Sequence, residues 1–252
     1  MMIDAHVHIE FGEYTPAYIE KMIERACECG VTEIWVLDHT HKFVEFKPVY
    51  EIIRADAFNR AWYDRKRPIP LSEFLDFAAA IRKNQYPVTV KFGLEVCYFE
   101  EKEAQLREIL SRYDFDFLIG SVHFIDGFGF DLSRENWEGK DVDHLYRRYY
   151  EITESLIKSK LFTSLGHPDA IKLFEKYPDY ELTGTYRRIA SLLKEYGMAT
   201  ENNSGLVRYG FPYPGLSPDF LRILKAEGVT IHRASDAHKI EDIGRLFERL
   251  EI

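Results

Sequence analysis

The sequence has few cysteines, no long apolar run and no excess of positive charge. Its three cysteines are too few for a disulfide framework, and Cys27 and Cys29 lie two apart in a helical pattern, where side chains do not face each other. We therefore expect a reducing, cytoplasmic environment. No run approaches the roughly 18 apolar residues of a membrane-spanning helix, and no basic and apolar signal-peptide pattern opens the chain. We expect a protein that is neither exported nor embedded in a membrane.

The net charge excludes one broad class of partner. Lys and Arg number 33 against 42 Asp and Glu, which gives a formal net charge of -9. Such a balance repels a polyanion, so we expect no nucleic-acid binding. A composition of 46% hydrophobic and 30% charged residues over 252 positions is enough for one sizeable buried core. We expect residues 1–252 to form a single domain.

Short β-type runs alternate with helical patterns along the chain. The first helical pattern begins after Thr15, which can cap it, and stops at Gly30. Alternating strands and helices favour a parallel sheet. Because no glycine-rich phosphate motif follows the first strand, we expect an α/β fold closed into a TIM-like (β/α)7 barrel rather than a Rossmann sheet. The predicted strands are 2–9, 33–37, 88–98, 115–124, 162–165, 198–201 and 229–234.

The segment 41–86 interrupts this alternation. It contains two helical patterns, 50–65 and 71–85, with no strand between them. Its residues are charged and aromatic rather than low in complexity, so disorder is not expected. We expect an ordered insertion in the connection between the second and third strands.

Histidines and carboxylates recur where the predicted strands end. Barrel active sites form at the C-terminal ends of strands, and side chains two residues apart on a strand point to the same face. Such a cluster in one mouth is costly without a cation to satisfy it, so we expect a multinuclear metal site. The strand-end residues are His6 and His8, Asp38 and His39, Glu95, His123, His167 and Asp169, and Asp236 and His238.

Each histidine also has a purely structural interpretation. A lone imidazole is more often a hydrogen-bonded core or surface residue than a ligand, and we keep that interpretation for His41, His144 and His232. The paired histidines and carboxylates of the first and last strands support one another, so for these residues we favour metal ligation over a structural role. Cys97 follows Glu95 by two residues, but no second cysteine lies nearby, so we favour a small buried side chain over a ligand.

These residues resemble the polymerase-and-histidinol-phosphatase (PHP) superfamily over nearly the whole chain. The similar motifs are 4–8, 38–39, 93–96 and 235–238. Those that resemble its histidinol-phosphatase branch are 119–131, 166–169 and 201–208. The resemblance implies a distorted seven-stranded barrel with three divalent metal ions, which are zinc, iron or manganese. It also implies a cytoplasmic enzyme of histidine biosynthesis, which hydrolyses L-histidinol phosphate to L-histidinol and phosphate by attack of a metal-bridging hydroxide.

The resemblance also implies a ligand set for each metal. In many family members the loop after the first motif supplies a further histidine, and here we expect Glu13 to replace it, with Glu10 as the second choice. We expect Glu95, Asp236 and His238 to take part in catalysis. The implied ligands are His6, His8, Glu95 and Asp236 for the first metal, Glu95, His123 and His167 for the second, and His39 and His238 for the third.

Arg208 is the residue that we expect to bind the substrate phosphate. It lies in the loop after a predicted strand, and its planar guanidinium can meet two phosphate oxygens at once. If the contact lies elsewhere, the arginines at 187 and 188 or those of the segment 41–86 are the next candidates. Asp131 or Glu135 suits the ammonium and imidazole of the substrate, and the choice between them stays open.

Three other functions fit parts of this pattern. A PHP-type protein-tyrosine phosphatase has similar metals and length but a different pattern after the second and third strands. A non-catalytic barrel of the kind fused to polymerases needs fewer ligand positions than this chain keeps. An amidohydrolase also uses a His-x-His pair, but the segments typical of the histidinol-phosphatase branch would then be coincidence. We expect a small phosphomonoester as substrate, and the oligomeric state stays open.

Overall fold

A parallel sheet of seven strands forms the centre of the computed structural model, which describes all 252 residues. Its strands are β1 (Ile3–His8), β2 (Glu33–His39), β3 (Thr89–Cys97), β4 (Phe117–Ser121), β7 (Ser164–Leu165), β8 (Ala199–Asn203) and β9 (Ile231–Ala234). They follow one another in the sheet in chain order. The chain after β9 returns to β1, where Val7 bridges to Ala237 and the His8 N–H donates to the Ala237 carbonyl at 2.7 Å. The sheet thus nearly closes, which confirms the predicted (β/α)7 barrel.

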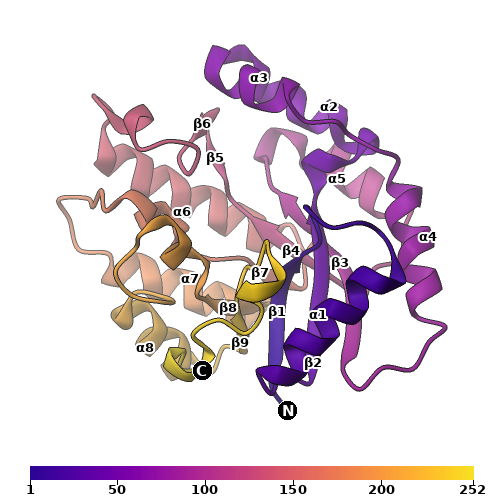
Figure 1. The fold of residues 1–252 in the computed structure, drawn as a ribbon. Coiled ribbons are helices and arrows are strands. Elements are labelled where there is room, and N and C mark those ends of the chain that lie inside the picture. The colour runs from indigo at the N-terminus through magenta and orange to yellow at the C-terminus, as the bar shows by residue number, and fades with distance from the viewer.

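Helices cover the outside of this sheet (Figure 1). On one side lie α6 (Val142–Lys158), α7 (Thr183–Tyr196) and α8 (Pro218–Glu227), and the other helices of the barrel are α1 (Pro16–Glu28), α4 (Leu71–Ile81) and α5 (Glu103–Leu110). Helix α1 starts as predicted, because the Thr15 hydroxyl accepts the N–H of Tyr18 at 3.3 Å. None of the helices is both long and apolar enough to cross a membrane.

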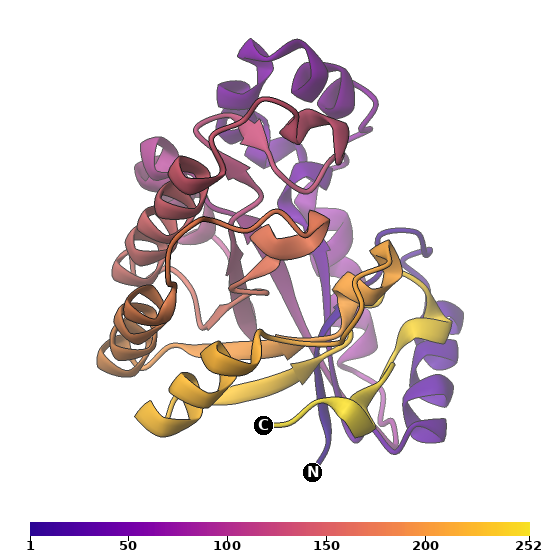
Figure 2. The ribbon, with the colours of Figure 1, turned by 90° about the vertical axis from the view of Figure 1, so that its left-hand side faces the viewer.

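The segment 41–86 is ordered, as expected, and most of it lies at the end of the barrel toward which the strands run (Figures 1 and 2). The single helix predicted over 50–65 is wrong, because the segment breaks into α2 (Lys47–Tyr50), a 3₁₀ turn and α3 (Ala57–Asp64). The break falls at Asp56, whose backbone is extended and whose carboxylate caps α3 by accepting the Asn59 N–H at 2.9 Å.

One hydrophobic cluster of 63 buried residues joins the barrel and the insertion. Tyr50, Ile53, Tyr63 and Phe74 of the insertion belong to it, and this burial explains why the segment is ordered. The predicted fourth strand is shorter than expected. After it, the chain forms a small antiparallel hairpin of β5 (Phe124–Ile125) and β6 (Phe128–Gly129) beside the insertion.

Candidate metal centre

Glu95, at the end of β3, is the hub of a cluster of histidines. Its carboxylate is 1% exposed, and the parallel register places it beside His39 of β2. One oxygen, Oε1, lies 2.9 Å from His167 Nε2 and 3.1 Å from His123 Nε2. The other oxygen, Oε2, lies 2.8 Å from His39 Nδ1, 3.5 Å from His8 Nε2 and 3.6 Å from His6 Nε2. Five imidazoles from four different strand ends therefore surround one carboxylate, as the strand-end pattern predicts.

Asp236 closes the cluster from the loop after β9. Its Oδ1 lies 3.2 Å from His8 Nε2, 3.8 Å from His6 Nε2 and 3.6 Å from His238 Nδ1. Its backbone adopts a left-handed φ of 52°, which aspartate tolerates better than most residues. Gly205 gives the carboxylate its space, because a Cβ at that position would lie 2.6 Å from Asp236 Oδ2.

Burial and mutual charge shift the pKa values of these groups in opposite directions. Burial favours the neutral acid of Glu95, but the surrounding imidazoles outweigh it and hold its pKa well below the ordinary value. Burial would lower the pKa of His123, yet Glu95 and Asp131 raise it to about 10. Burial, together with His238 and other nearby imidazoles, lowers the pKa of His8. Charges of both signs are thus concentrated in a largely buried cluster.

The chemistry of these residues fits divalent cations. Glu95 Oε2 forms no well-directed hydrogen bond, although His39 Nδ1 lies 2.8 Å away, and the Nε2 atoms of His6 and His8 face each other at 3.1 Å. Imidazole and carboxylate together are donors that suit zinc, iron and manganese. Three sets have ligand atoms within 4.8 Å of one another: His6, His8 and Asp236; His8, His39 and His238; and His39, Glu95 and His123.

Every expected ligand except Glu13 lies in this cluster. Glu13 is exposed, whereas Glu10 Oε2 lies 3.6 Å from His238 Nε2 and 3.8 Å from His39 Nε2. The chain turns directly after β1, where the Gly12 N–H donates to the Ile9 carbonyl. Because of this turn, Glu10 still points to the mouth of the barrel and Glu13 lies beyond it.

A cavity of about 650 Å³ opens over the cluster. Arg208 lines it, donates from Nη1 to the Asp236 carbonyl and places Nη2 3.6 Å from Asp236 Oδ1. Burial opposes its charge, but Asp236 raises the pKa of the guanidinium further above its ordinary value. Arg187 and Arg188 lie on α7 and outside this cavity. Of the arginines considered in α7 and the loop after β8, only Arg208 faces the histidines.

Asp131 lines the same cavity, and its Oδ2 accepts a hydrogen bond from His123 Nδ1 at 2.8 Å. Glu135 lies outside the cavity and interacts with Ser133 instead. Cys97 is buried, as expected, and borders the cavity. Of these two carboxylates, only that of Asp131 is therefore within reach of a molecule bound in the cavity.

Sequence reasoning missed several residues of the cavity. His41, interpreted as structural, has its ring 4.9 Å from that of His39 and its Nε2 3.6 Å from Glu10 Oε1. Trp62 and Lys66 of the insertion also line the cavity, and no periodic pattern marks them. His144 and His232 lie outside it, in agreement with a structural role. Buried Glu201 was not among the predicted site residues. It is a carboxylate on a predicted strand, which is the same pattern that identified Glu95.

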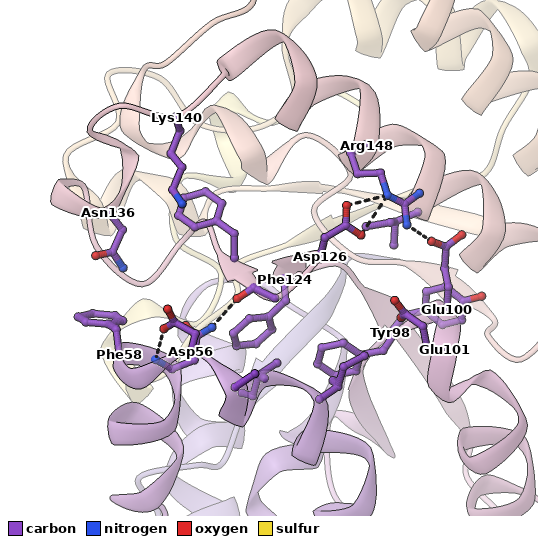
Figure 3. Close-up of a pocket in the computed structure, with 18 residues that line it drawn as sticks. Asp56, Phe58, Tyr98, Glu100, Glu101, Phe124, Asp126, Asn136, Lys140 and Arg148 are labelled. Atoms are coloured by element: carbon purple, nitrogen blue, oxygen red, sulfur yellow. Dashed lines mark hydrogen bonds and ion pairs between the residues drawn. The ribbon is translucent and has the colours of Figure 1, made fainter.

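A second cavity of about 620 Å³ lies between α3, the hairpin β5–β6 and α6 (Figure 3). The guanidinium of Arg148 in this cavity is bound by the carboxylates of Asp126 and Glu100. The ammonium of Lys140 lies 4.9 Å from the centre of the Phe128 ring. No histidine lines it. Its guanidinium is already paired and it holds no cluster of histidines, so the candidate active site is the cavity over Glu95.

Fold and cluster together define a class of protein: α/β barrels whose strand ends gather histidines and carboxylates in one mouth. Within that class, the chain belongs to the PHP domain family, whose model matches residues 4–205.

The chain is similar to proteins named probable histidinol-phosphatase. The one from Deinococcus radiodurans is 25% identical, over 98% of this chain and 90% of that protein. The one from Schizosaccharomyces pombe is 21% identical, over 97% and 83%. Among solved structures, a histidinol phosphate phosphatase (HisK) from Lactococcus lactis in complex with zinc, L-histidinol and phosphate has a TM-score of 0.67 at 19% identity, covering 98% of this chain and 93% of that one. A provisionally assigned HisK from Listeria monocytogenes reaches 0.78 at 18% identity, covering 99% and 100%. These structural similarities establish the shared fold.

Proposed function

We propose that this protein is a metal-dependent phosphatase that hydrolyses L-histidinol phosphate to L-histidinol and phosphate. The observation that carries the proposal is Glu95 among five imidazoles, with Arg208 on the wall of the same cavity. Similarity to histidinol-phosphatases over nearly the full length supports the choice of substrate.

We assign three divalent ions to the cluster, with zinc favoured over iron and manganese because a similar structure holds zinc. Glu10 takes the place that the sequence suggested for Glu13. When bound, such ions supply a nucleophile from water at neutral pH and neutralise the charge on phosphoryl oxygens. The proposed ligands are His6, His8, Glu95 and Asp236; Glu95, His123 and His167; and His39, His238 and Glu10.

The chain's own residues orient the substrate in this scheme. Arg208 offers two parallel N–H groups to phosphate oxygens, a geometry that lysine cannot reproduce. Asp131 offers a carboxylate to the ammonium or imidazole of histidinol from the same cavity. Asp131 also holds His123 Nδ1, so the His123 ring is fixed with Nε2 toward Glu95. Positioning of this kind lowers the entropic part of the activation free energy of hydrolysis.

We also propose that residues 1–252 act as one domain in the cytoplasm. One hydrophobic cluster extends through the barrel and the insertion, and none of the three cysteines forms a disulfide. Both features suit a reducing compartment and a single folding unit.

The test is phosphate release by the purified protein, after its metal content has been measured. We expect a higher kcat/KM for histidinol phosphate than for phosphotyrosine. Glu95→Gln should lose most activity and metal, because a shared anion is removed from two sites, whereas Glu73→Gln on the exposed face of α4 should change neither. A higher kcat/KM for phosphotyrosine contradicts the proposed substrate and favours the tyrosine-phosphatase alternative.

A further inference from the structure

Glu201 of β8 is a fully buried carboxylate directly behind the cluster. Its two oxygens lie 3.1 and 3.0 Å from His6 Nδ1. Oε1 also accepts the backbone N–H of His167 at 2.8 Å and the side-chain N–H of Asn203 at 2.6 Å. Three donors from three different strand ends thus converge on one carboxylate, and Glu201 itself faces away from the cavity lining.

This arrangement determines which nitrogen of His6 carries a proton. An ionised carboxylate only accepts hydrogen bonds, so the proton of the neutral His6 ring lies on Nδ1. The lone pair is then on Nε2, which points to the cluster, 3.1 Å from His8 Nε2 and 3.6 Å from Glu95 Oε2. A metal ligand needs this lone pair, and the group that holds the other nitrogen fixes it.

The same carboxylate holds the backbone of His167. That residue has a positive φ of 23°, a conformation that side chains other than glycine rarely adopt and that its surroundings must stabilise. With its N–H bound to Glu201, the His167 ring places Nε2 2.9 Å from Glu95 Oε1. His6 and His167 approach opposite oxygens of Glu95, so Glu201 sets the relative placement of ligands on both sides of the bridge.

We propose that Glu201 is a positioning residue for the metal centre, which fixes the tautomer of His6 and the backbone of His167 so that both present Nε2. This inference rests on the metal dependence within the proposed function. Glu201 does not line the cavity, so its contribution is to metal affinity.

The variant Glu201→Gln separates this role from a merely structural one. A glutamine side chain has the same shape but only one acceptor oxygen. His167 and Asn203 require that oxygen on the Oε1 side, so the amide NH₂ faces His6 Nδ1. His6 Nδ1 then keeps only the Oε1 contact at 3.1 Å, which it shares with two other donors, and faces an N–H donor where Oε2 accepted. The proton is therefore held less firmly on Nδ1, and the Nε2 lone pair that faces the centre is less well fixed.

The experiment measures zinc binding and the proton position, both without substrate. Titration of metal-free protein with zinc should show an affinity about 10- to 100-fold weaker in Glu201→Gln at one or more sites. The control, Glu33→Gln, removes another buried carboxylate at the opposite end of the barrel and should leave zinc affinity unchanged. Unaltered zinc affinity in a folded Glu201→Gln variant overturns the proposal.

Imidazole ¹⁵N chemical shifts of the zinc-loaded wild-type protein give a second readout that needs no variant. His6 should coordinate through Nε2 and carry a proton on Nδ1. Coordination through Nδ1, or a proton on Nε2, also overturns the inference, even if Glu201→Gln does not fold. If zinc binds as expected but histidinol phosphate is not hydrolysed, the proposed substrate fails and the role of Glu201 stands.

Discussion

Arg208 combines a backbone contact with a position on the cavity wall. Its side chain holds the Asp236 carbonyl and lies close to the Asp236 carboxylate. The loss of one such partly buried contact changes stability by about 1 kcal/mol. A hydrogen-bond donor to a developing charge contributes more to catalysis than to folding. Activity and stability measurements on Arg208 variants can therefore separate its two roles.

We predict that Arg208→Ala loses about 2 to 4 kcal/mol of transition-state stabilisation, which is about a 30- to 1,000-fold drop in kcat/KM. Its melting temperature should change little, and Arg208→Lys should recover only part of the activity because it lacks the planar fork. Steady-state kinetics on histidinol phosphate checks this, with exposed Arg222→Ala as control. Wild-type turnover by Arg208→Ala would place the phosphate contact elsewhere.

Glu33, at the start of β2, gives a prediction about pH that does not depend on the metal centre. Its Oε1 accepts from Trp35 Nε1 at 2.6 Å and pairs with Lys91 Nζ at 2.7 Å. Burial raises the pKa of Glu33, but Lys91 and Trp35 outweigh it and hold the pKa below its ordinary value of 4.5. A carboxyl with a lowered pKa stabilises the fold above its unfolded pKa, and this contribution is lost as pH falls through the folded value.

Glu33→Gln should therefore lower the free energy of unfolding by about 1 to 2 kcal/mol at pH 7. The difference from wild type should shrink as pH falls below 4.5 and vanish once Glu33 is protonated. Urea denaturation at a series of pH values measures it, and the exposed Glu227→Gln serves as control. A destabilisation that is the same at pH 3 and pH 7 would show that the charge of Glu33 does not contribute.

Among the elements, a buried ion pair joins the loop after β7 to the loop before α8. Lys172 is 2% exposed, and its Nζ donates to Asp169 Oδ2 at 2.7 Å and to the Gly215 carbonyl at 2.8 Å. Asp169 also accepts from the backbone and hydroxyl of Ser217. The loop between β8 and α8, which these contacts hold, includes Arg208. The ion pair therefore helps to position a residue of the cavity wall.

Removal of one partner of a buried pair leaves the other charge uncompensated, at a cost of about 3 to 5 kcal/mol. Lys172→Met should therefore destabilise the protein strongly. The double variant Lys172→Met/Asp169→Asn should be more stable than Lys172→Met alone, because no charge remains buried. Urea denaturation compares them, with exposed Lys225→Met as control. A double variant less stable than Lys172→Met would contradict this account.

The elements also show how far sequence reasoning extends. The seven strands are predictable because apolar runs separated by helical periods dictate a parallel sheet, and strand ends then identify Glu95 and its histidines. The hairpin β5–β6 has two residues in each strand and so no periodicity to detect. The exchange of Glu13 for Glu10 depends on a loop turn, and Trp62 and Lys66 depend on how the insertion packs over the mouth. Such contacts arise from tertiary packing, which a linear pattern does not contain.

At the scale of the whole molecule, we expect the proposed metals to stabilise the fold as well as to support activity. Ligands that bind only the native state stabilise it by mass action, by about 4 kcal/mol at a thousand times the dissociation constant. We predict that exhaustive chelation abolishes phosphate release and lowers the melting temperature, and that zinc or manganese restores both. Calorimetry and elemental analysis before and after chelation measure this. Full activity in protein shown to be free of metal would contradict it.

The contact between β1 and the chain after β9 has a consequence for biosynthesis. Asp236 and His238 are made more than two hundred residues after His6 and His8, and the cluster needs both pairs. At about 5 to 20 residues per second, the first histidines wait on the order of ten seconds or more for their partners. A nascent chain therefore cannot assemble the complete centre until Asp236 and His238 have left the ribosome.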